Sequence, residues 1–286
     1  MPVVITGASG LVGPYVVRAL TGRAPEIRAV VRRPEAAPAL RELGAKVAVT
    51  ALSDADTLAT VMRGAHTVVH LAGGLDLPDD AAFEQANLGT VVAALAAARE
   101  ARLVRFVFLS FPGASPDSSN AYLRAKGLAE RVIGESGLEF AVIRSNHVLG
   151  PGGAWVTALV RQARSHPAIV VGPGTQRLAP VYVEDVASVL AAADDRSGLA
   201  SGTWALDGPR VVTADELTDL VAGRSRRKLH LGPSSIARLS RLVRRPASPV
   251  TLDVLARDAL GDAPAAATEF GVELTPLPQA LARSLG

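Results

Sequence analysis

The sequence predicts an α/β protein with a doubly wound parallel sheet and a smaller carboxy-terminal lobe. Two observations support the sheet. An apolar run leads into a glycine-rich turn at the start of the chain, and apolar strands then alternate with helical patterns. Strands that alternate with helices are joined by crossover connections, which place the strands parallel and the helices on both faces. The length of 286 residues, 49% of them hydrophobic, suffices for one large domain with a smaller lobe.

The opening strand, turn and helix predict a phosphate-binding loop. The apolar run 3–6 is followed by Gly7, Gly10 and Gly13 and by apolar residues at helical spacing. In a dinucleotide-binding Rossmann fold, such glycines permit a tight turn, close approach of a pyrophosphate and close packing of the helix. The pyrophosphate then lies at the helix N-terminus, where backbone N–H groups and the helix dipole favour an anion. The residues expected to bind the cofactor here are Thr6, Gly7, Ser9, Gly10, Leu11, Val12 and Gly13.

Two arginines, Arg32 and Arg33, end the second predicted strand. In this fold the end of that strand faces the adenosine ribose. An acidic residue there binds the 2′-hydroxyl of NAD, whereas arginine accommodates the 2′-phosphate of NADP. A guanidinium offers a phosphate two aligned donors and a permanent charge. The sequence therefore favours NADP(H) as the cofactor, although two solvated surface arginines would give the same pattern.

The following elements continue the alternation to a fifth strand. Leu52, after the third strand, is expected to pack on the adenine ring, and the small residues after the fourth strand let the backbone approach the cofactor. His70, inside the fourth strand, is interpreted as a packed histidine and not as a metal ligand. Leu71, Ala72 and Gly73, after the fourth strand, are expected to be further cofactor contacts. The predicted elements are a helix over 36–43, a strand over 46–50, a helix capped near 53–54, a strand from 67, a helix over 81–101 and a strand over 105–110.

The composition excludes several classes of site. The chain has no cysteine, which excludes disulfides, thiolate metal sites and cysteine nucleophiles, and its five histidines form no metal pattern, so no metal is expected. A strand begins at residue 2 and no apolar run approaches about 20 residues, so we expect neither a signal peptide nor a membrane span, and a cytoplasmic location. The net charge of +3 is mild, so no nucleic acid is expected as a partner.

The candidate catalytic pair is Tyr122 and Lys126, which follow the fifth strand. They are four residues apart on a predicted helix and share one face of it. A nearby ammonium stabilises a phenolate and lowers the pKa of the phenol. Such a tyrosine donates a proton to a carbonyl oxygen as hydride arrives at the carbon, and the lysine is also expected to bind the nicotinamide ribose.

At this point the sequence resembles the short-chain dehydrogenase/reductase superfamily, in particular its extended and atypical branches. The resemblance covers essentially the whole chain. It implies a nicotinamide cofactor and the catalytic use of Tyr122 with Lys126. The atypical branch includes NAD(P)H-binding reductases, redox-sensor-like proteins and the accessory nucleotide-binding subunit of respiratory complex I. The matching stretches are 6–13, 87–90, Tyr122 with Lys126, 143–144 with 150–152, and 181–187.

The sequence departs from this resemblance at two places. Competent extended members place serine or threonine just beyond the fifth strand to orient the substrate carbonyl, and here Phe111 holds that position, with Ser110 one residue earlier. Strand alternation points Ser110 to the other face unless the backbone turns. Ser110 is nevertheless the candidate to polarise the carbonyl, with Ser118 or Ser119 as substitutes. Ala51 stands where an aspartate often contacts adenine.

The second half of the chain is interpreted mainly by analogy. A sixth strand over 139–144 leads into Asn146, which the resemblance places beside the nicotinamide. The expected organisation is an NADP-binding core over 1–150, to which 180–195 returns, and a smaller substrate lobe over 151–286. Later elements, including a strand over 204–207 and a helix with a capping box at Thr213 and Glu216, are assigned to that lobe.

An arginine-rich segment over 224–245 contains no acidic residue. Apolar residues at helical spacing between 236 and 243 predict an amphipathic helix. Either this helix packs on the lobe with solvated arginines, or the segment contacts anionic lipid weakly or a phosphorylated or carboxylated substrate. The sequence leaves these alternatives and the oligomeric state open.

Taken together, the sequence predicts an NADP(H)-dependent oxidoreductase that reduces a carbonyl of a small organic substrate. Tyr122 donates the proton, and Lys126 supports it. The alternatives are a non-catalytic NADP(H)-binding sensor or assembly protein, which Phe111 favours, and a nucleotide-sugar epimerase or dehydratase. The missing serine and the two arginines count against the last of these.

Overall fold

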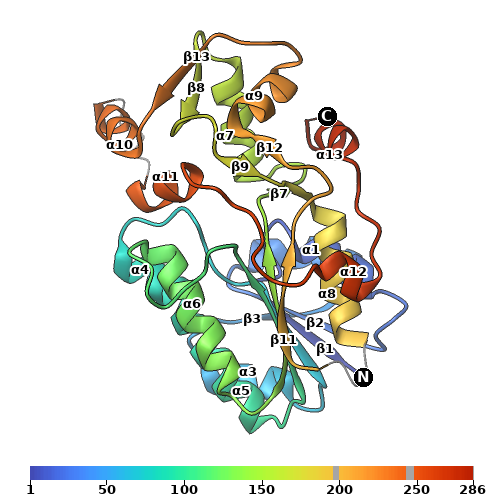
Figure 1. The fold of residues 1–286 in the computed structure, drawn as a ribbon. Helices are drawn as coiled ribbons and strands as arrows, with labels where there is room; N and C mark the ends of the chain where they lie inside the picture. Colours follow the sequence, from blue (N-terminus) through green and yellow to red (C-terminus); the bar gives the residue numbers. More distant parts are fainter. Residues whose placement is uncertain (196–199, 243–247, 286) are drawn as a thin grey trace.

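The computed structural model describes residues 1–195, 200–242 and 248–285, and Figure 1 shows their arrangement. The predicted parallel sheet is present. Seven strands lie in the order β11-β6-β5-β4-β1-β2-β3, and every neighbouring pair is parallel. The strands are β1 (Val3–Thr6), β2 (Ile27–Val31), β3 (Lys46–Val49), β4 (Thr67–His70), β5 (Arg105–Ser110), β6 (Glu139–Ser145) and β11 (Gly202–Leu206).

Helices cover both faces of this sheet, because successive side chains of a buried strand point to opposite faces. Val3 and Ile5 of β1 pack in one apolar cluster with α1 and α8, and Val4 packs in the other with α3, α5 and α6. The helices of the sheet region are α1 (Gly13–Leu20), η1 (Pro34–Ala36), α2 (Ala37–Glu42), α3 (Ala55–Met62), α4 (Asp80–Glu84), η2 (Gln85–Gly89), α5 (Thr90–Glu100), α6 (Ala121–Gly134), α8 (Val183–Asp195) and α12 (Ala266–Phe270).

The strand order reverses between β1 and β4. The chain runs from β1 outward through β2 and β3, and then returns to the other side of β1 for β4, β5 and β6. In open α/β sheets, ligands bind in the crevice outside the carboxyl ends of the strands at such a switch point. The fold therefore places the glycine turn after β1 at the expected ligand site.

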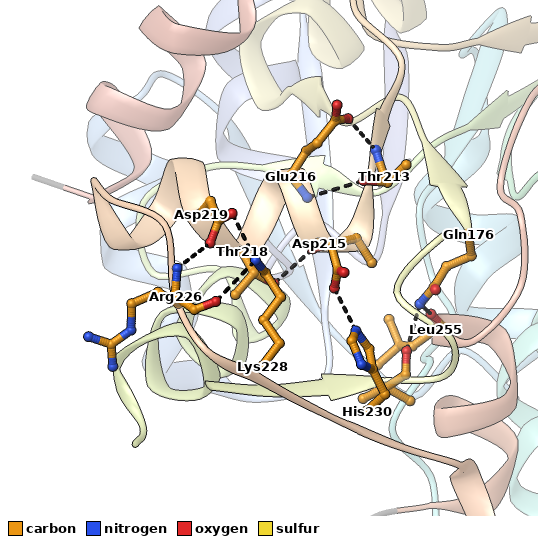
Figure 2. Close-up of polar contacts among 12 residues, drawn as sticks. Gln176, Thr213, Asp215, Glu216, Thr218, Asp219, Arg226, Lys228, His230 and Leu255 are labelled. Carbon is orange, nitrogen blue, oxygen red and sulfur yellow. Dashed lines mark hydrogen bonds and ion pairs between the residues drawn. The ribbon is translucent and has the colours of Figure 1, made fainter. Parts of the chain in front are cut away.

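The second lobe lies beyond the carboxyl ends of the strands (Figure 1). Its predicted capping box is present, since Thr213 and Glu216 bond reciprocally at the start of α9 (Figure 2). Its two strand pairs are β8 (Ala168–Val171) with β13 (Lys228–Leu231), and β9 (Arg177–Leu178) with β12 (Val212–Thr213). Its helices are α7 (Ala154–Arg164), α9 (Ala214–Ala222), α10 (Pro233–Leu242) and α11 (Pro249–Leu255), while β7 (Val148–Leu149), β10 (Val181–Tyr182) and α13 (Leu277–Leu285) lie nearer the sheet.

One expectation about the lobe is wrong. The strand expected within it, β11, is the edge strand of the main sheet and pairs with β6. Trp204 and Leu206 are buried in the same apolar cluster as α8, and Phe270 of α12 packs edge-on to Trp204 with ring centroids 5.3 Å apart. The core therefore gathers segments well beyond residue 195, which a short isolated strand pattern does not reveal.

The helix expected over 81–101 is present as a continuous helical stretch from Asp80 to Glu100. Its 21 residues and mean hydropathy of 1.2 make it long and apolar enough to cross a membrane by length and composition alone. In the structure its apolar face lies in the core, where Phe83 and Val91 are fully buried. A π-helical turn over Gln85–Gly89 interrupts it beside the ligand crevice, as such turns often do near functional sites.

The arginine-rich segment forms the predicted amphipathic helix, α10, in its described part. Ile236 and Ala237 pack with Val171 and Leu252, so part of the apolar face is covered by β8 and α11. Residues 243–245 of the segment lie outside the described residues.

Candidate functional site

The turn between β1 and α1 requires its glycines for steric reasons. Gly7 has a positive φ of 72°, and a Cβ there would lie 2.6 Å from the backbone nitrogen of Ala72. A Cβ on Gly13 would lie 2.1 Å from the carbonyl oxygen of Ala8. These close approaches hold the turn against β4 and α1 against β1. The backbone geometry therefore matches the roles that the sequence predicts for the first and third glycines.

A cavity of ≈ 630 Å³ lies over this turn, at the carboxyl ends of β1, β2 and β4. We call it the cofactor cavity. Its size suits an extended ligand such as a dinucleotide. Nine of the predicted cofactor residues line it together: Gly7, Ser9, Gly10, Arg32, Arg33, Leu52, Leu71, Ala72 and Gly73. Its other lining residues are Val30, Ala51, Ser53, Leu77, Ala82, Gln85, Ala86 and Thr90.

The charge of the cofactor cavity comes from Arg32 and Arg33. Both side chains are exposed, and no ion pair within the described part of the chain involves either of them. None of the residues that line the cavity is acidic. The cavity therefore presents two uncompensated guanidinium groups at the end of β2, the arrangement that suits a phosphate.

Several predicted cofactor residues do not line this cavity. Thr6 is fully buried, and its hydroxyl is 2.8 Å from His70 Nδ1. Leu11 packs toward Gly150 and Gly153, and Val12 is buried in the core. The side chains of Thr6 and Val12 thus point into the core, and that of Leu11 points toward the segment after β7.

His70 is a packed core histidine, as predicted. Its ring nitrogens lie 2.8 Å from the Thr6 hydroxyl and 3.2 Å from the Thr90 hydroxyl. Burial lowers its pKa to about 3, because a charged imidazolium loses its hydration there. No cluster of potential metal ligands occurs among the described residues.

Asn87, in the π-helical turn, is a residue that sequence reasoning did not assign to the site. Its side chain is fully buried and holds the loop after β4, with bonds of 3.1 Å to both the N–H and the C=O of Gly74. A Cβ on the neighbouring Gly73 would lie 2.6 Å from Asn87 Oδ1. Asn87 therefore positions the wall of the cofactor cavity. The sequence signal that could have identified Asn87 is its position in 87–90, one of the stretches that match the superfamily.

The candidate catalytic helix is α6, which starts at the predicted residue. Asn120 is its N-cap and accepts bonds from the backbone of Tyr122 and Leu123. The Asn120 amide also donates to Val250 O and Asp253 Oδ2, at 3.0 and 2.8 Å. The cap thereby ties α11 of the lobe to the helix that carries Tyr122 and Lys126.

Lys126 reaches the edge of the cofactor cavity. Its Nζ donates to Leu109 O at 2.9 Å and lies 4.5 Å from the centre of the Phe108 ring. A Cβ on Gly73, which lines the cavity, would be 3.3 Å from this Nζ. Burial lowers the pKa of Lys126 to about 8, while the carboxylate of Glu130 opposes that shift.

Tyr122 lies in an aromatic row. Its ring is edge-on to Phe83 and Phe111, with centroids 6.3 and 5.7 Å away. Its hydroxyl makes no hydrogen bond within the described part of the chain, and burial raises its pKa above the ordinary value of 10.0. The expected lowering by Lys126 is therefore wrong for this state of the protein. Desolvation outweighs the ammonium, which lies 6.0 Å from the ring centre.

Ser110 does not join Tyr122. Its hydroxyl donates to Glu130 Oε1 at 2.5 Å, and Glu130 in turn pairs with Arg144 at 2.7 Å. Strand alternation places Ser110 on the α6 face of the sheet, with Phe106 and Phe108, and turns Phe111 toward Tyr122. The geometry removes Ser110 from the candidate catalytic group and leaves Phe111 beside the phenol. The substitutes, Ser118 and Ser119, make no hydrogen bond to Tyr122 in the part of the chain that the structure describes; Ser118 lines a separate surface cavity with Phe111.

Asn146 also departs from its predicted role beside the nicotinamide. It is 1% exposed, and its amide donates to Asp207 Oδ1 at 2.9 Å and to Ala259 O. Its oxygen accepts the backbone N–H of His147 at 2.8 Å. These bonds hold the side chain between Asp207, which follows β11, and Ala259, and Asn146 does not line the cofactor cavity. Its partners are far away in the sequence, which is why the motif alone did not reveal them.

Comparison with known proteins adds the family. Residues 3–204 match the NAD dependent epimerase/dehydratase family. Ceramide reductase of Caulobacter vibrioides is 31% identical over 190 residues, 66% of this chain and 60% of that protein. Subunit 9 of the NADH dehydrogenase (ubiquinone) 1 alpha subcomplex from Arabidopsis thaliana mitochondria is 29% identical over 226 residues, 76% of this chain and 56% of that protein. The chain thus spans less than two thirds of the length of either relative.

A third relative is matched over most of its length. A farnesyl dihydroquinoline-oxide ketoreductase of Stigmatella aurantiaca is 27% identical over 301 residues, 93% of this chain and 90% of that protein. Among solved structures, UDP-glucose 4-epimerase of Thermotoga maritima has a TM-score of 0.78 at 18% identity, covering 100% of this chain and 97% of that one. The same enzyme of Thermus thermophilus, in complex with NAD, has a TM-score of 0.76 at 20% identity and covers 100% and 98%. These two structures share the fold.

Proposed function

The chain belongs to the NAD dependent epimerase/dehydratase family, and from this premise we propose that it is a reductase that uses NADPH to reduce a carbonyl of a small organic molecule. Relatives named as reductases support an oxidoreductase. The observation that carries the proposal is that the predicted cofactor residues and the candidate catalytic helix lie next to each other. The cofactor cavity holds two unpaired arginines at one end, and at the other end it adjoins Lys126, four residues from Tyr122 on α6.

The residues of the cofactor cavity fit a nicotinamide dinucleotide phosphate. The glycine turn and the start of α1 would hold the pyrophosphate through backbone N–H groups. Arg32 and Arg33 would bind the 2′-phosphate, and Leu52 would pack on the adenine. Lys126, beside Gly73, would hold the nicotinamide ribose. When bound, the cofactor supplies the hydride.

Tyr122 would supply the proton to the carbonyl oxygen. Burial raises the pKa of this phenol, so the group is protonated at neutral pH, which is the form that donates a proton. The positive charge of Lys126 would then stabilise the phenolate that proton transfer leaves behind.

A specific observation favours a second candidate function, an NADP(H)-binding sensor or assembly protein without turnover. The Phe111 ring stands edge-on to Tyr122, where competent relatives are expected to place a hydroxyl, and Phe111 cannot polarise a carbonyl. A subunit of NADH dehydrogenase and a photosystem II assembly factor are among the relatives. In this candidate the cofactor cavity keeps its role and Tyr122 has none.

One experiment tests both the cofactor and the activity. We expect NADPH to bind at least about tenfold more tightly than NADH, because charge-assisted bonds from arginine to the 2′-phosphate are absent in NADH. In the double variant R32A/R33A this preference disappears, while NADH binds as before. Fluorescence titration of both cofactors measures it. The double variant R23A/R41A, which loses two exposed arginines elsewhere, controls for net charge.

The same preparations are then assayed for NADPH oxidation with a panel of ketones, aldehydes and quinones. Equal affinities for NADPH and NADH would remove the role of the two arginines. Tight NADPH binding without oxidation by any carbonyl would favour the sensor over the reductase.

A further inference from the structure

A second, smaller cavity lies inside the lobe, among α7, β8, α9 and the end of α11; we call it the lobe cavity. Its volume is ≈ 50 Å³, room for about four water-sized groups at the ~10–15 Å³ that each needs. Its walls are mainly apolar, with Leu159, Val171 and Leu217 among them. The buried polar residues that line it are His147, Gln176 and Thr218, whose hydroxyl donates to Ala214 O, and the half-buried Gln162 lines it as well.

His147 and Gln176 have a property in common. Within the described part of the chain, the only buried side-chain nitrogen or oxygen atoms without a hydrogen-bond partner are His147 Nε2 and Gln176 Oε1. The side chains come from positions 29 residues apart in the sequence, yet both orphaned atoms belong to residues that line the lobe cavity. Buried polar groups are rarely left unpaired, so such a coincidence calls for an explanation.

Neighbouring hydrogen bonds determine which nitrogen of His147 carries the proton, and they leave Nε2 with a free lone pair. The amide nitrogen of Asn146 donates to Asp207 and Ala259, which fixes Asn146 Oδ1 as an acceptor. His147 Nδ1 lies 3.3 Å from this oxygen and therefore carries the proton. Burial lowers the pKa of His147 to about 4, so the ring is neutral at pH 7. Its Nε2 is then a bare acceptor.

Gln176 is oriented in the same way. Its amide nitrogen donates to Val171 O at 2.6 Å and to Leu255 O at 3.1 Å, and Figure 2 shows the side chain reaching toward Leu255. Two carbonyl oxygens can only receive the NH₂ group, so the flip of the amide is settled and Oε1 is an acceptor. The lobe cavity thus contains two acceptors, and no donor in the described part of the chain bonds to either.

Packed aromatic rings connect the lobe cavity with the candidate catalytic group. The His147 ring is edge-on to Phe111 with centroids 5.1 Å apart, and Phe111 packs on Tyr122. On its other side the His147 ring lies 4.7 Å from the Trp155 ring, which lines the cavity. A row of packed rings therefore runs from Tyr122 through Phe111 to His147, one of the two acceptors.

We propose that the lobe cavity is a binding site for an apolar group that ends in a hydrogen-bond donor, a hydroxyl for example, received by His147 Nε2 and Gln176 Oε1. Asn146 acts as a positioning residue, because it sets the tautomer of His147. That this group is the far end of the reduced substrate rests on the proposed reductase function. The binding of the group itself does not.

The binding test uses two isomers that differ in the donor: butan-1-ol has an O–H, and methyl propyl ether has none. The chain has 2 tryptophans, so W204F leaves Trp155, beside the cavity, as the sole tryptophan and as the reporter under selective excitation of indole. We expect saturable quenching with a Kd for the alcohol at least about tenfold below that for the ether. Equal Kd values, or no saturable quenching, would overturn the proposal, since acceptors served only by resident water would not discriminate.

Variants assign the effect to the acceptors. H147F keeps a ring against Phe111 and Trp155 but removes Nε2, and it should reduce the preference for the alcohol to less than about threefold. T157V changes an exposed residue of α7 whose hydroxyl bonds only Gly153 O, and it should leave the preference intact. If H147F keeps the full preference, His147 is not the receiving group. If H147F does not fold, the comparison of the two isomers on the parent protein still decides.

A kinetic measurement then places the site relative to the reaction. With NADPH, 8-hydroxyoctan-2-one should have a KM about tenfold below that of nonan-2-one, with kcat unchanged, since the hydroxyl contributes binding energy far from the carbonyl. If neither ketone is reduced while the alcohol preference persists, the reductase function fails and the donor site stands. Equal KM values for the two ketones would remove the substrate role of the lobe cavity.

Discussion

The cofactor cavity and the lobe cavity are prepared for their ligands in opposite ways. The first is walled by glycine backbone and exposed arginines, and its unpaired guanidinium groups remain hydrated. The second is walled mainly by apolar side chains, and its unpaired acceptors are buried. An exposed unpaired charge costs little, whereas a buried unpaired acceptor costs about 1–3 kcal/mol. A polar group without a partner therefore indicates a bound ligand much more strongly inside the lobe than at the surface.

Tyr122 and Lys126 lie on the boundary between these two environments. Both are almost fully buried, like the lobe acceptors, yet Lys126 adjoins Gly73 of the cofactor cavity. Burial raises the pKa of Tyr122 and lowers that of Lys126, and both shifts favour the neutral form of the group. The boundary thus combines a neutral phenol with an ammonium, and the following substitutions test whether that combination performs chemistry.

The largest effect is expected from Y122F. It removes the proposed proton donor and keeps the ring packed on Phe83 and Phe111, so turnover with NADPH and a ketone should fall by about 10²–10⁴-fold. NADPH binding should not change, because the hydroxyl does not line the cofactor cavity. Steady-state kinetics and a binding titration measure the two effects, with Y15F as the matched control. Turnover within a few-fold of the parent would exclude Tyr122 as the proton donor.

An intermediate effect is expected from pH through Lys126. Its pKa is lowered from 10.5 to about 8, so the ammonium loses its proton as the pH rises through about 8. If the charge supports Tyr122, kcat/KM should fall by about tenfold per pH unit above this value. K126R should abolish the falling limb, since arginine stays charged. If kcat/KM of K126R still falls above about pH 8, the titrating group is not Lys126.

The same pKa shift has the opposite consequence for stability. The unfolded lysine, with a pKa near 10.5, binds more protons than the folded one between about pH 8 and 10.5. The contribution of Lys126 to the free energy of unfolding therefore rises with pH across this window. Activity and stability should diverge there, which separates loss of the catalytic charge from unfolding.

The smallest effect on turnover is expected from S110A. Ser110 bonds Glu130 on the far face of β5, so kcat/KM should stay within about twofold of the parent value. The lost bond to a charged group should lower the free energy of unfolding by about 1–3 kcal/mol. Kinetics and denaturant unfolding measure the two. A drop in turnover of a hundredfold without loss of stability would return Ser110 to the catalytic group.

The sequence predicted the cofactor side well because its signals are local. Gly7, Gly10 and Gly13 lie within one turn, and the arginines directly follow one strand. It predicted the lobe side poorly because that side is assembled from distant segments. His147, Gln176 and Leu255 meet only in the folded chain, and the partners of Asn146 lie at positions 207 and 259.

The sequence by itself determined the strand–turn–helix order, the parallel sheet, the basic end of the cofactor cavity and the pairing of Tyr122 with Lys126 on one helix. These features follow from backbone sterics and helical periodicity, which act over a few residues. Tertiary structure decided the direction of Ser110, the edge position of β11 and the orientation of Asn146. It also decided which buried atoms lack a partner, because burial and hydrogen-bond satisfaction depend on what packs against a residue from elsewhere in the chain.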